Sequence, residues 1–166
     1  MRLDGYRDLA EVRSSSRSRV YRGERSSDGA SVIVKVALEG GEGRLLSEYS
    51  LLQRLDLPGV TRALDFLHGP EGPVLVLEDA GRSDLAGVLA RGRLPLDEAW
   101  TLAIQLAEIV ARVHQRDIAH LDICPGNVVV DGDLGWLTLV DFGRASHAPG
   151  LTRARGLRGR RADELR

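Results

Sequence analysis

Apolar and polar residues alternate along the first half of the chain in short runs that end at turn-forming residues. Between residues 6 and 38 these runs are rich in Val and Tyr, and the Asp28-Gly29 pair between two of them is typical of a β-hairpin. Another two runs flank a Gly- and Pro-rich turn at 69–73. The strands that this pattern predicts are 6–12, 20–25, 31–38, 61–68 and 74–81.

Three segments instead have the 3.6-residue spacing of amphipathic helices: 43–55, 83–92 and 94–116. We expect Ser83 to cap the second of them. The first is predicted to carry Leu45, Glu48, Tyr49, Leu52 and Leu55 on one face. The apolar stripe predicted for the third consists of Leu96, Trp100, Ala103, Ala107, Val110 and His114.

The order of these elements predicts an α+β fold. A β-rich first part with one helix is followed by a linker near 79–83 and by a helical second part. The second part ends in a small hairpin, in which the strand 128–130 and the segment 136–143 flank a turn at 131–135.

Composition and charge limit the possible partners. The chain has 166 residues and a net charge of −1, which gives no long-range attraction to nucleic acid or to an anionic membrane. Its single cysteine, Cys124, excludes an internal disulfide and a Cys-based zinc site. Residues 1–20 lack the apolar core of a signal peptide, and no run reaches the roughly 18 apolar residues of a membrane span. We therefore expect a cytoplasmic protein without a nucleic-acid or membrane partner.

The basic residues are unusually biased, since 22 are Arg and one, Lys35, is Lys. A chain that uses Arg so consistently is expected to keep a Lys where a compact ammonium is needed. Lys35 is therefore a candidate for a specific role.

Several short motifs occur in the order and with the spacing of a known family. They are "VIVK" at 32–35, "SEYSLL" at 47–52, "VLVLEDAG" at 74–81, "HLDICPGN" at 120–127 and "DFG" at 141–143. Together they resemble the protein kinase family from the first strand to Gly143. "VYRGER" and "RLDLPGV" further resemble the kinase-like domain that opens large bacterial multidomain signalling proteins.

The resemblance implies a two-lobe fold, with an N-lobe at 1–78 and a partial C-lobe at 79–143. The remaining residues, 144–166, are Arg- and Gly-rich, and we expect a poorly ordered tail. It also implies ATP and Mg²⁺ as cofactors and a Ser or Thr hydroxyl of an unknown protein as the phosphate acceptor.

The resemblance assigns roles to individual residues. Lys35, held by Glu48, would contact the ATP phosphates, and Asp122 would accept the proton of the attacking hydroxyl. Asn127 and Asp141 would hold Mg²⁺, and the hairpin would bring them together. The remaining residues implied for nucleotide binding are Val20, Leu77, Glu78, Ala80, Ser15 and Ser18. We expect His120 to pack near Phe142, and Cys124 to be a small buried filler.

The sequence departs from the family pattern in its phosphate-covering loop and its catalytic loop. Arg13, Ser15 and Ser18 occupy the three Gly places, which predicts weaker nucleotide binding. Leu121 replaces an Arg that receives an activation-loop phosphate, and Cys124 replaces a Lys that reaches the transferring phosphate. Losing such a group can cost about 2.7–4 kcal/mol of barrier, which predicts a slow enzyme or none.

The chain also ends 23 residues after Gly143, without an "APE" motif. We therefore expect a truncated C-lobe, in which one apolar face of the long helix depends on a partner or on self-association for cover.

Two alternatives stay open. A pseudokinase would bind nucleotide or a partner without turnover, which the changed loops favour. A small-molecule phosphotransferase of the aminoglycoside or choline type uses a similar loop, often with the Pro-Gly-Asn found at 125–127. The hinge and "DFG" favour the protein kinase branch.

Overall fold

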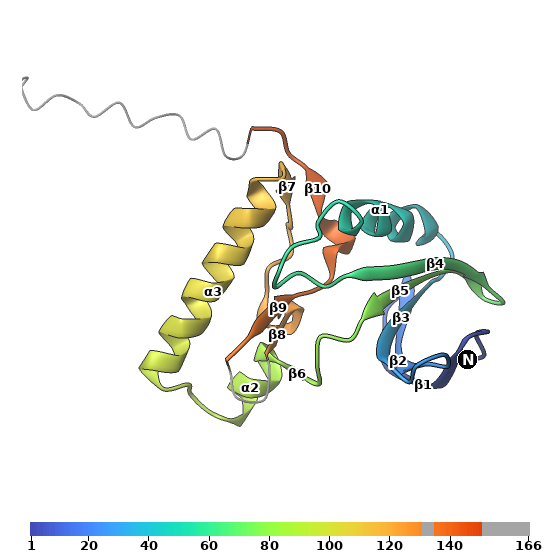
Figure 1. Ribbon diagram of the computed structural model, residues 1–166, viewed down its shortest axis with the longest axis horizontal. Coiled ribbons are helices and arrows are strands. Elements are labelled where there is room, and N and C mark those ends of the chain that lie inside the picture. The colour runs from blue at the N-terminus through green and yellow to red at the C-terminus, as the bar shows by residue number, and fades with distance from the viewer. Residues whose placement is uncertain (131–134, 151–166) are drawn as a thin grey trace, which may run out of the picture.

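The first half of the chain forms a five-stranded antiparallel sheet in the order β1-β2-β3-β5-β4. This arrangement comes from a computed structural model that describes residues 1–130 and 135–150. Figure 1 shows the sheet beside the N-terminus. The strands are β1 (Tyr6–Ser14), β2 (Ser18–Arg25), β3 (Ser31–Ala37), β4 (Ala63–Gly69) and β5 (Gly72–Glu78).

A single helix, α1 (Glu42–Leu52), packs against this sheet through contacts with β3, β4 and β5. Its buried residues are Leu45, Glu48 and Leu52. Leu45 and Leu52 belong to the hydrophobic core, and the spacing between them places Glu48 on the same inward face. The apolar anchoring of α1 thus fixes the position of a buried carboxylate.

The second half is built from two helices and two small sheets. β8 (Val128–Val130) lies between β6 (Ser83–Asp84) and β9 (Leu137–Leu139), and β7 (Ile118–Ala119) pairs with β10 (Ser146–His147). The helices are α2 (Leu85–Arg91) and α3 (Leu96–His114), with short 3-10 helices at Pro125–Asn127 and Phe142–Arg144. In Figure 1, α3 and the five-stranded sheet lie on opposite sides of β8 and β9.

The alternation of side chains along β3 directs its two faces to two hydrophobic clusters. Val32, Val34 and Val36 pack with the β5 residues Val74 and Val76 on one face of the sheet. Lys35 lies between Val34 and Val36 in the sequence, so its side chain points to the opposite face of the sheet. On that side one cluster continues from β5 and α1 into α3 and the hairpin, so the two halves share a core.

The predicted α+β class is confirmed, but two details of the helices were wrong. The N-cap of α2 is Asp84, whose Oδ1 accepts a 2.7 Å hydrogen bond from the Gly87 N–H, and Ser83 belongs to β6 instead. The buried residues of α3 are Leu102, Ile109 and Val113. Four residues of the stripe predicted for α3 are exposed: Leu96, Trp100, Ala103 and Ala107.

Parts of the predicted hairpin turn and tail lie outside the described residues, namely 131–134 and 151–166. Ser146 and His147, at the beginning of the predicted tail, form β10. In the part of the chain that the structure covers, no helix is both long and apolar enough to span a bilayer.

Candidate active site

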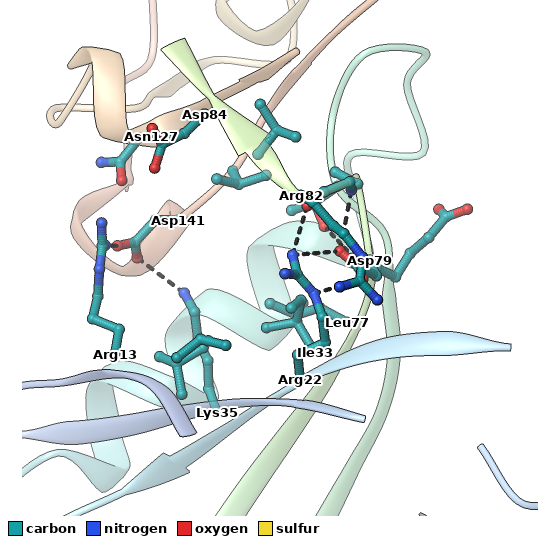
Figure 2. Close-up of a pocket in the computed structure, with 18 of the residues that line it drawn as sticks. Arg13, Arg22, Ile33, Lys35, Leu77, Asp79, Arg82, Asp84, Asn127 and Asp141 are labelled. Carbon is teal, nitrogen blue, oxygen red and sulfur yellow. Dashed lines mark hydrogen bonds and ion pairs between the residues drawn. The ribbon is translucent and has the colours of Figure 1, made fainter. Parts of the chain in front are cut away.

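A cavity of about 310 Å³ lies between the five-stranded sheet and the β8–β9 hairpin. Figure 2 shows its polar side chains. Its apolar walls come from Val20, Ile33, Leu77, Val129 and Val140, and the connection from Glu78 to Arg82 forms one side. Lys35, Asn127 and Asp141 line the polar end together with Arg13. An apolar slot with a charged end is the usual form of a small-molecule site.

Lys35 lies at the centre of the charged end. Its Nζ donates to Glu48 Oε1 at 2.6 Å and to Asp141 Oδ1 at 2.9 Å, and Lys35 and Glu48 are both buried. Burial alone lowers the pKa of an ammonium, but the two carboxylates outweigh it and hold the pKa of Lys35 above its usual value. The same burial raises the pKa of Glu48, an effect that Lys35 opposes. The structure therefore presents a fixed ammonium to the cavity.

The loop 120–127 is held from within by His120. Its ring stacks edge-on against Phe142 with the centroids 4.5 Å apart, as expected from the sequence. The Asp122 N–H donates to His120 Nδ1 at 3.2 Å, so Nδ1 is the acceptor and Nε2 donates to the Val140 carbonyl at 3.1 Å. Burial lowers the pKa of His120, which keeps the ring neutral in this arrangement. His120 therefore positions the loop.

Asn127 and Asp141 meet across the hairpin as the sequence predicted. Val140 N–H donates to the Asn127 carbonyl at 3.0 Å, and the Asn127 side chain donates to the Asp122 carbonyl at 2.9 Å. Asp141 is a non-glycine residue with left-handed backbone angles (φ 63°, ψ 66°), a conformation that costs free energy and that is common at active sites. Burial raises the pKa of Asp141, but Lys35 outweighs it and leaves the pKa below its usual value.

The donor set of Asn127 and Asp141 fits Mg²⁺, which binds few protein oxygens and takes its other ligands from phosphate and water. Within residues 1–130 and 135–150 no cluster of three His, Cys, Asp or Glu side chains could hold a metal by itself. A divalent ion at this site would therefore depend on a phosphate ligand.

The connection between the two halves is fixed by Asp79, a residue that the sequence analysis did not single out. Arg22 Nε and Nη2 donate to the two Asp79 carboxylate oxygens at 2.8 and 3.1 Å, and Ser31 Oγ donates at 2.7 Å. Arg22 also donates to the Gly81 carbonyl at 2.6 Å. These bonds tie β2 to the connection beside Leu77, Glu78 and Ala80, which line the cavity as expected.

The turn between β1 and β2 holds Ser15, and β2 begins at Ser18; both are residues implied for nucleotide binding. Ser15 Oγ bonds to Ser18 within the loop, with 3.1 Å to the Ser18 carbonyl. Both serines line a neighbouring cavity rather than the one described above. Arg13, by contrast, reaches the polar end, where Nη1 lies 3.7 Å from Asp141 Oδ2.

Asp122 has a cationic neighbour that the sequence did not indicate, since Arg144 Nη1 lies 3.3 Å from Asp122 Oδ1. The expectation that Cys124 is buried was wrong, because this residue is exposed immediately before the 3-10 helix Pro125–Asn127. Leu121 is exposed as well.

The sequence is similar to those of known protein kinases. The model of the protein kinase domain matches residues 6–161. Serine/threonine-protein kinase pkn2 of Myxococcus xanthus is 35% identical over 152 residues, which cover 86% of this chain and 18% of that protein. CBL-interacting protein kinase 4 of Oryza sativa subsp. japonica is 35% identical over 139 residues, 78% of this chain and 30% of that protein. Aurora kinase B of Xenopus tropicalis is 34% identical over 116 residues, 69% and 32% of the two chains. The chain thus spans less than a third of the length of these relatives.

Proposed function

The chain belongs to the protein kinase family, and we propose that it binds ATP in the cavity between the sheet and the hairpin and transfers the γ-phosphoryl group to a Ser or Thr hydroxyl of a protein. The observation that carries this proposal is the position of Lys35 between Glu48 and Asp141. Phosphoryl transfer depends mainly on fixed positive charge around the phosphates. A buried Lys held by two carboxylates supplies such a charge without reorganisation.

The adenine ring would lie against Val20 and Leu77 and bond to the backbone of Glu78 and Ala80. The apolar walls suit a flat heterocycle. The Glu78 carbonyl accepts a long 3.4 Å bond from Thr61 Oγ1, and a carbonyl oxygen has a second lone pair that a ligand could use. The hydrogen bonds from Arg22 and Ser31 to Asp79 keep this backbone in one position.

The reaction itself would depend on Asp122, Asn127 and Asp141. Asp122 would accept the proton of the attacking hydroxyl. Asn127 would keep Asp122 in position through the hydrogen bond that its side chain donates to the Asp122 carbonyl. Asn127 and Asp141 would hold Mg²⁺, which when bound neutralises charge on the phosphates. Before Asp122 could accept this proton, the acceptor hydroxyl would have to displace Arg144 from the Asp122 carboxylate.

A second candidate function is nucleotide binding without turnover, as in a regulatory module. Two observations favour it: Arg144 occupies one oxygen of Asp122, and Ser15 and Ser18 replace loop glycines. A small-molecule phosphotransferase is less well supported, because the model that matches is that of the protein kinase domain. The phosphate acceptor, the cytoplasmic location and a partner that covers the exposed face of α3 stay predictions.

The test separates binding from chemistry. Thermal unfolding with and without ATP and Mg²⁺ measures binding, and transfer of labelled phosphate to a generic protein substrate measures turnover. We expect ATP to stabilise the wild type and Lys35→Met to lose that effect. Asp122→Asn should keep ATP binding and lower the transfer rate about 100-fold or more, whereas Asp97→Asn, an exposed change on α3, should alter neither.

The outcomes are distinct. Stabilisation by ATP without detectable transfer supports the second candidate. Transfer that is unchanged in Asp122→Asn contradicts the assigned role of that residue. An absence of any ATP effect on the wild type rules out both functions.

A further inference from the structure

Arg13 takes the place of a loop glycine and brings a guanidinium to the polar end of the nucleotide cavity. It lies on β1, opposite Val20 of β2, and Figure 2 shows its side chain extending to Asp141 beside Lys35. Its Nη1 is 3.7 Å from Asp141 Oδ2, and its Nη2 is 3.5 Å from the position that a Cβ on Gly126 would take. Arg13 therefore spans from the sheet to the catalytic loop.

This guanidinium is held loosely. The contact with Asp141 is longer than the roughly 2.7–2.9 Å of a charged hydrogen bond, and the Arg13 side chain is 55% exposed. Among residues 1–130 and 135–150 it makes no side-chain hydrogen bond. Its N–H donors thus stay available to a ligand, and a guanidinium presents them in the fork geometry that suits phosphate oxygens.

The surroundings of Arg13 carry an excess of positive charge. A second cavity of about 310 Å³ adjoins the first and shares Arg13, Val20, Lys35 and Asp141 with it. Five cations and two carboxylates line this second cavity. They are Arg13, Arg17, Lys35, Arg44 and Arg144, with Glu48 and Asp141. The excess of three positive charges, five minus two, favours a polyanion at this end of the site.

Asp141 also has limited capacity for a metal. Lys35 bonds to its Oδ1, and Arg13 lies against its Oδ2. A divalent ion must compete with a cation that already belongs to the chain, and within the described residues it finds one further predicted ligand, Asn127.

We propose, on the basis of the ATP-binding function above, that Arg13 is a built-in counter-cation for the phosphates of a nucleoside triphosphate, so that nucleotide binding by this chain does not require a divalent metal, whereas Asn127 and Asp141 would hold Mg²⁺ for the transfer step. Arg13 leaves Asp141 for the phosphate oxygens as the nucleotide enters between Arg13 and Lys35. Its side-chain cation takes over the neutralisation that backbone amides of a glycine loop would otherwise supply.

The experiment is a titration of ATP by calorimetry in two buffers, one with EDTA and one with Mg²⁺. The variants are Arg13→Ala and Arg7→Ala, which remove the same charge from the same strand. Arg7 is a matched control because it pairs with Glu24 at 2.8 Å on the surface and lines neither of these cavities.

We expect wild type and Arg7→Ala to lose less than about tenfold in affinity when EDTA replaces Mg²⁺. Arg13→Ala should lose about tenfold or more in EDTA, the value of one charged hydrogen bond. With Mg²⁺ present, the loss in Arg13→Ala should be smaller, because Asp141 is then free for the metal.

ATP binding by the wild type that strictly requires Mg²⁺ overturns this inference and leaves the proposed function intact. An equal loss in Arg13→Ala in both buffers also overturns it, since Arg13 would then act independently of the metal. If ATP binds in neither buffer, the proposed function fails and the inference fails with it.

Discussion

Replacing Arg22 by Ala should destabilise the protein, because it leaves the Asp79 carboxylate buried without its counter-ion. The Asp79 side chain is 6% exposed and receives two hydrogen bonds from Arg22, while Arg22 is 25% exposed. Ser31 and the Gly81 N–H would remain as donors to Asp79. Arg22→Ala therefore removes the positive charge beside Asp79 but leaves two of the hydrogen bonds to its carboxylate.

The size of the expected loss in stability follows from the burial of the Arg22–Asp79 pair. Removing one partner of a fully buried pair costs about 3–5 kcal/mol. Since a quarter of Arg22 is solvent-exposed and two donors to Asp79 remain, we expect about 2–3 kcal/mol. For a chain of 166 residues this is a fall of about 4–12 °C in Tm.

The matched control is Arg25→Ala, which breaks a pair of the same geometry on the surface. Arg25 Nε and Nη2 donate to the two Asp28 oxygens at 3.0 and 2.7 Å, but both side chains are exposed. Exposed pairs contribute little because water screens them, so Arg25→Ala should hardly change Tm. Thermal and urea unfolding of both variants measure the difference. Equal values for Arg22→Ala and Arg25→Ala would refute the reasoning.

The pH dependence of the Arg22 effect gives an independent check. Burial raises the pKa of Asp79, but hydrogen bonds from Ser31 and Arg22 outweigh this and leave the pKa below its usual value. The stabilisation is therefore complete above the unfolded pKa of about 3.9 and is lost as the pH falls through the lower folded pKa. The gap in stability between wild type and Arg22→Ala should narrow below about pH 4.

Two further predictions concern the core and the catalytic loop. In urea titrations, Gly59→Ala should lower the free energy of unfolding by about 1–3 kcal/mol more than Gly40→Ala does. A Cβ at Gly59 would lie 2.5 Å from Ile109 Cδ1. Gly40 is the control because it has a similar φ of +77° and a Cβ there meets nothing within 4 Å. Because burial lowers the pKa of His120, the folded state binds fewer protons, so Tm should fall as the pH drops below about 6.5. The fall in Tm should be shallower in His120→Gln. A Tm that depends on pH identically in wild type and His120→Gln would contradict the lowered pKa of His120.

The buried parts of the site were implied by the resemblance to the protein kinase family, and local rules explain how the chain places them. Alternation along β3 places Lys35 opposite the Val face, and helical spacing places Glu48 between Leu45 and Leu52. The pairing of β8 with β9 then brings Asp141 to Lys35. The meeting of Lys35 with Glu48 and Asp141, which are 13 and 106 positions away, came from the resemblance and not from these local rules.

Other features depend on contacts that no local pattern encodes. Arg22 and Asp79 are 57 residues apart, and either alone resembles an ordinary surface charge. Periodicity showed that α3 is amphipathic, but the stripe predicted through Leu96 and Trp100 was wrong, and the buried residues are Leu102, Ile109 and Val113. The exposure of Cys124 likewise depends on where the loop turns.

The two arginines beside Asp141 and Asp122 differ in kind from the Lys35 pair, and this difference limits what they can do. Arg13 and Arg144 are 55% and 61% exposed, and their contacts with Asp141 and Asp122 are 3.7 and 3.3 Å long. Exposed pairs of this kind contribute about 0–1 kcal/mol, so neither arginine is held firmly to its carboxylate and a ligand can displace either of them. Lys35 lies under this layer and keeps its partners. Under the proposed function, the cations of the chain would therefore contribute to phosphate affinity, and transfer would require a substrate to displace Arg144 from Asp122.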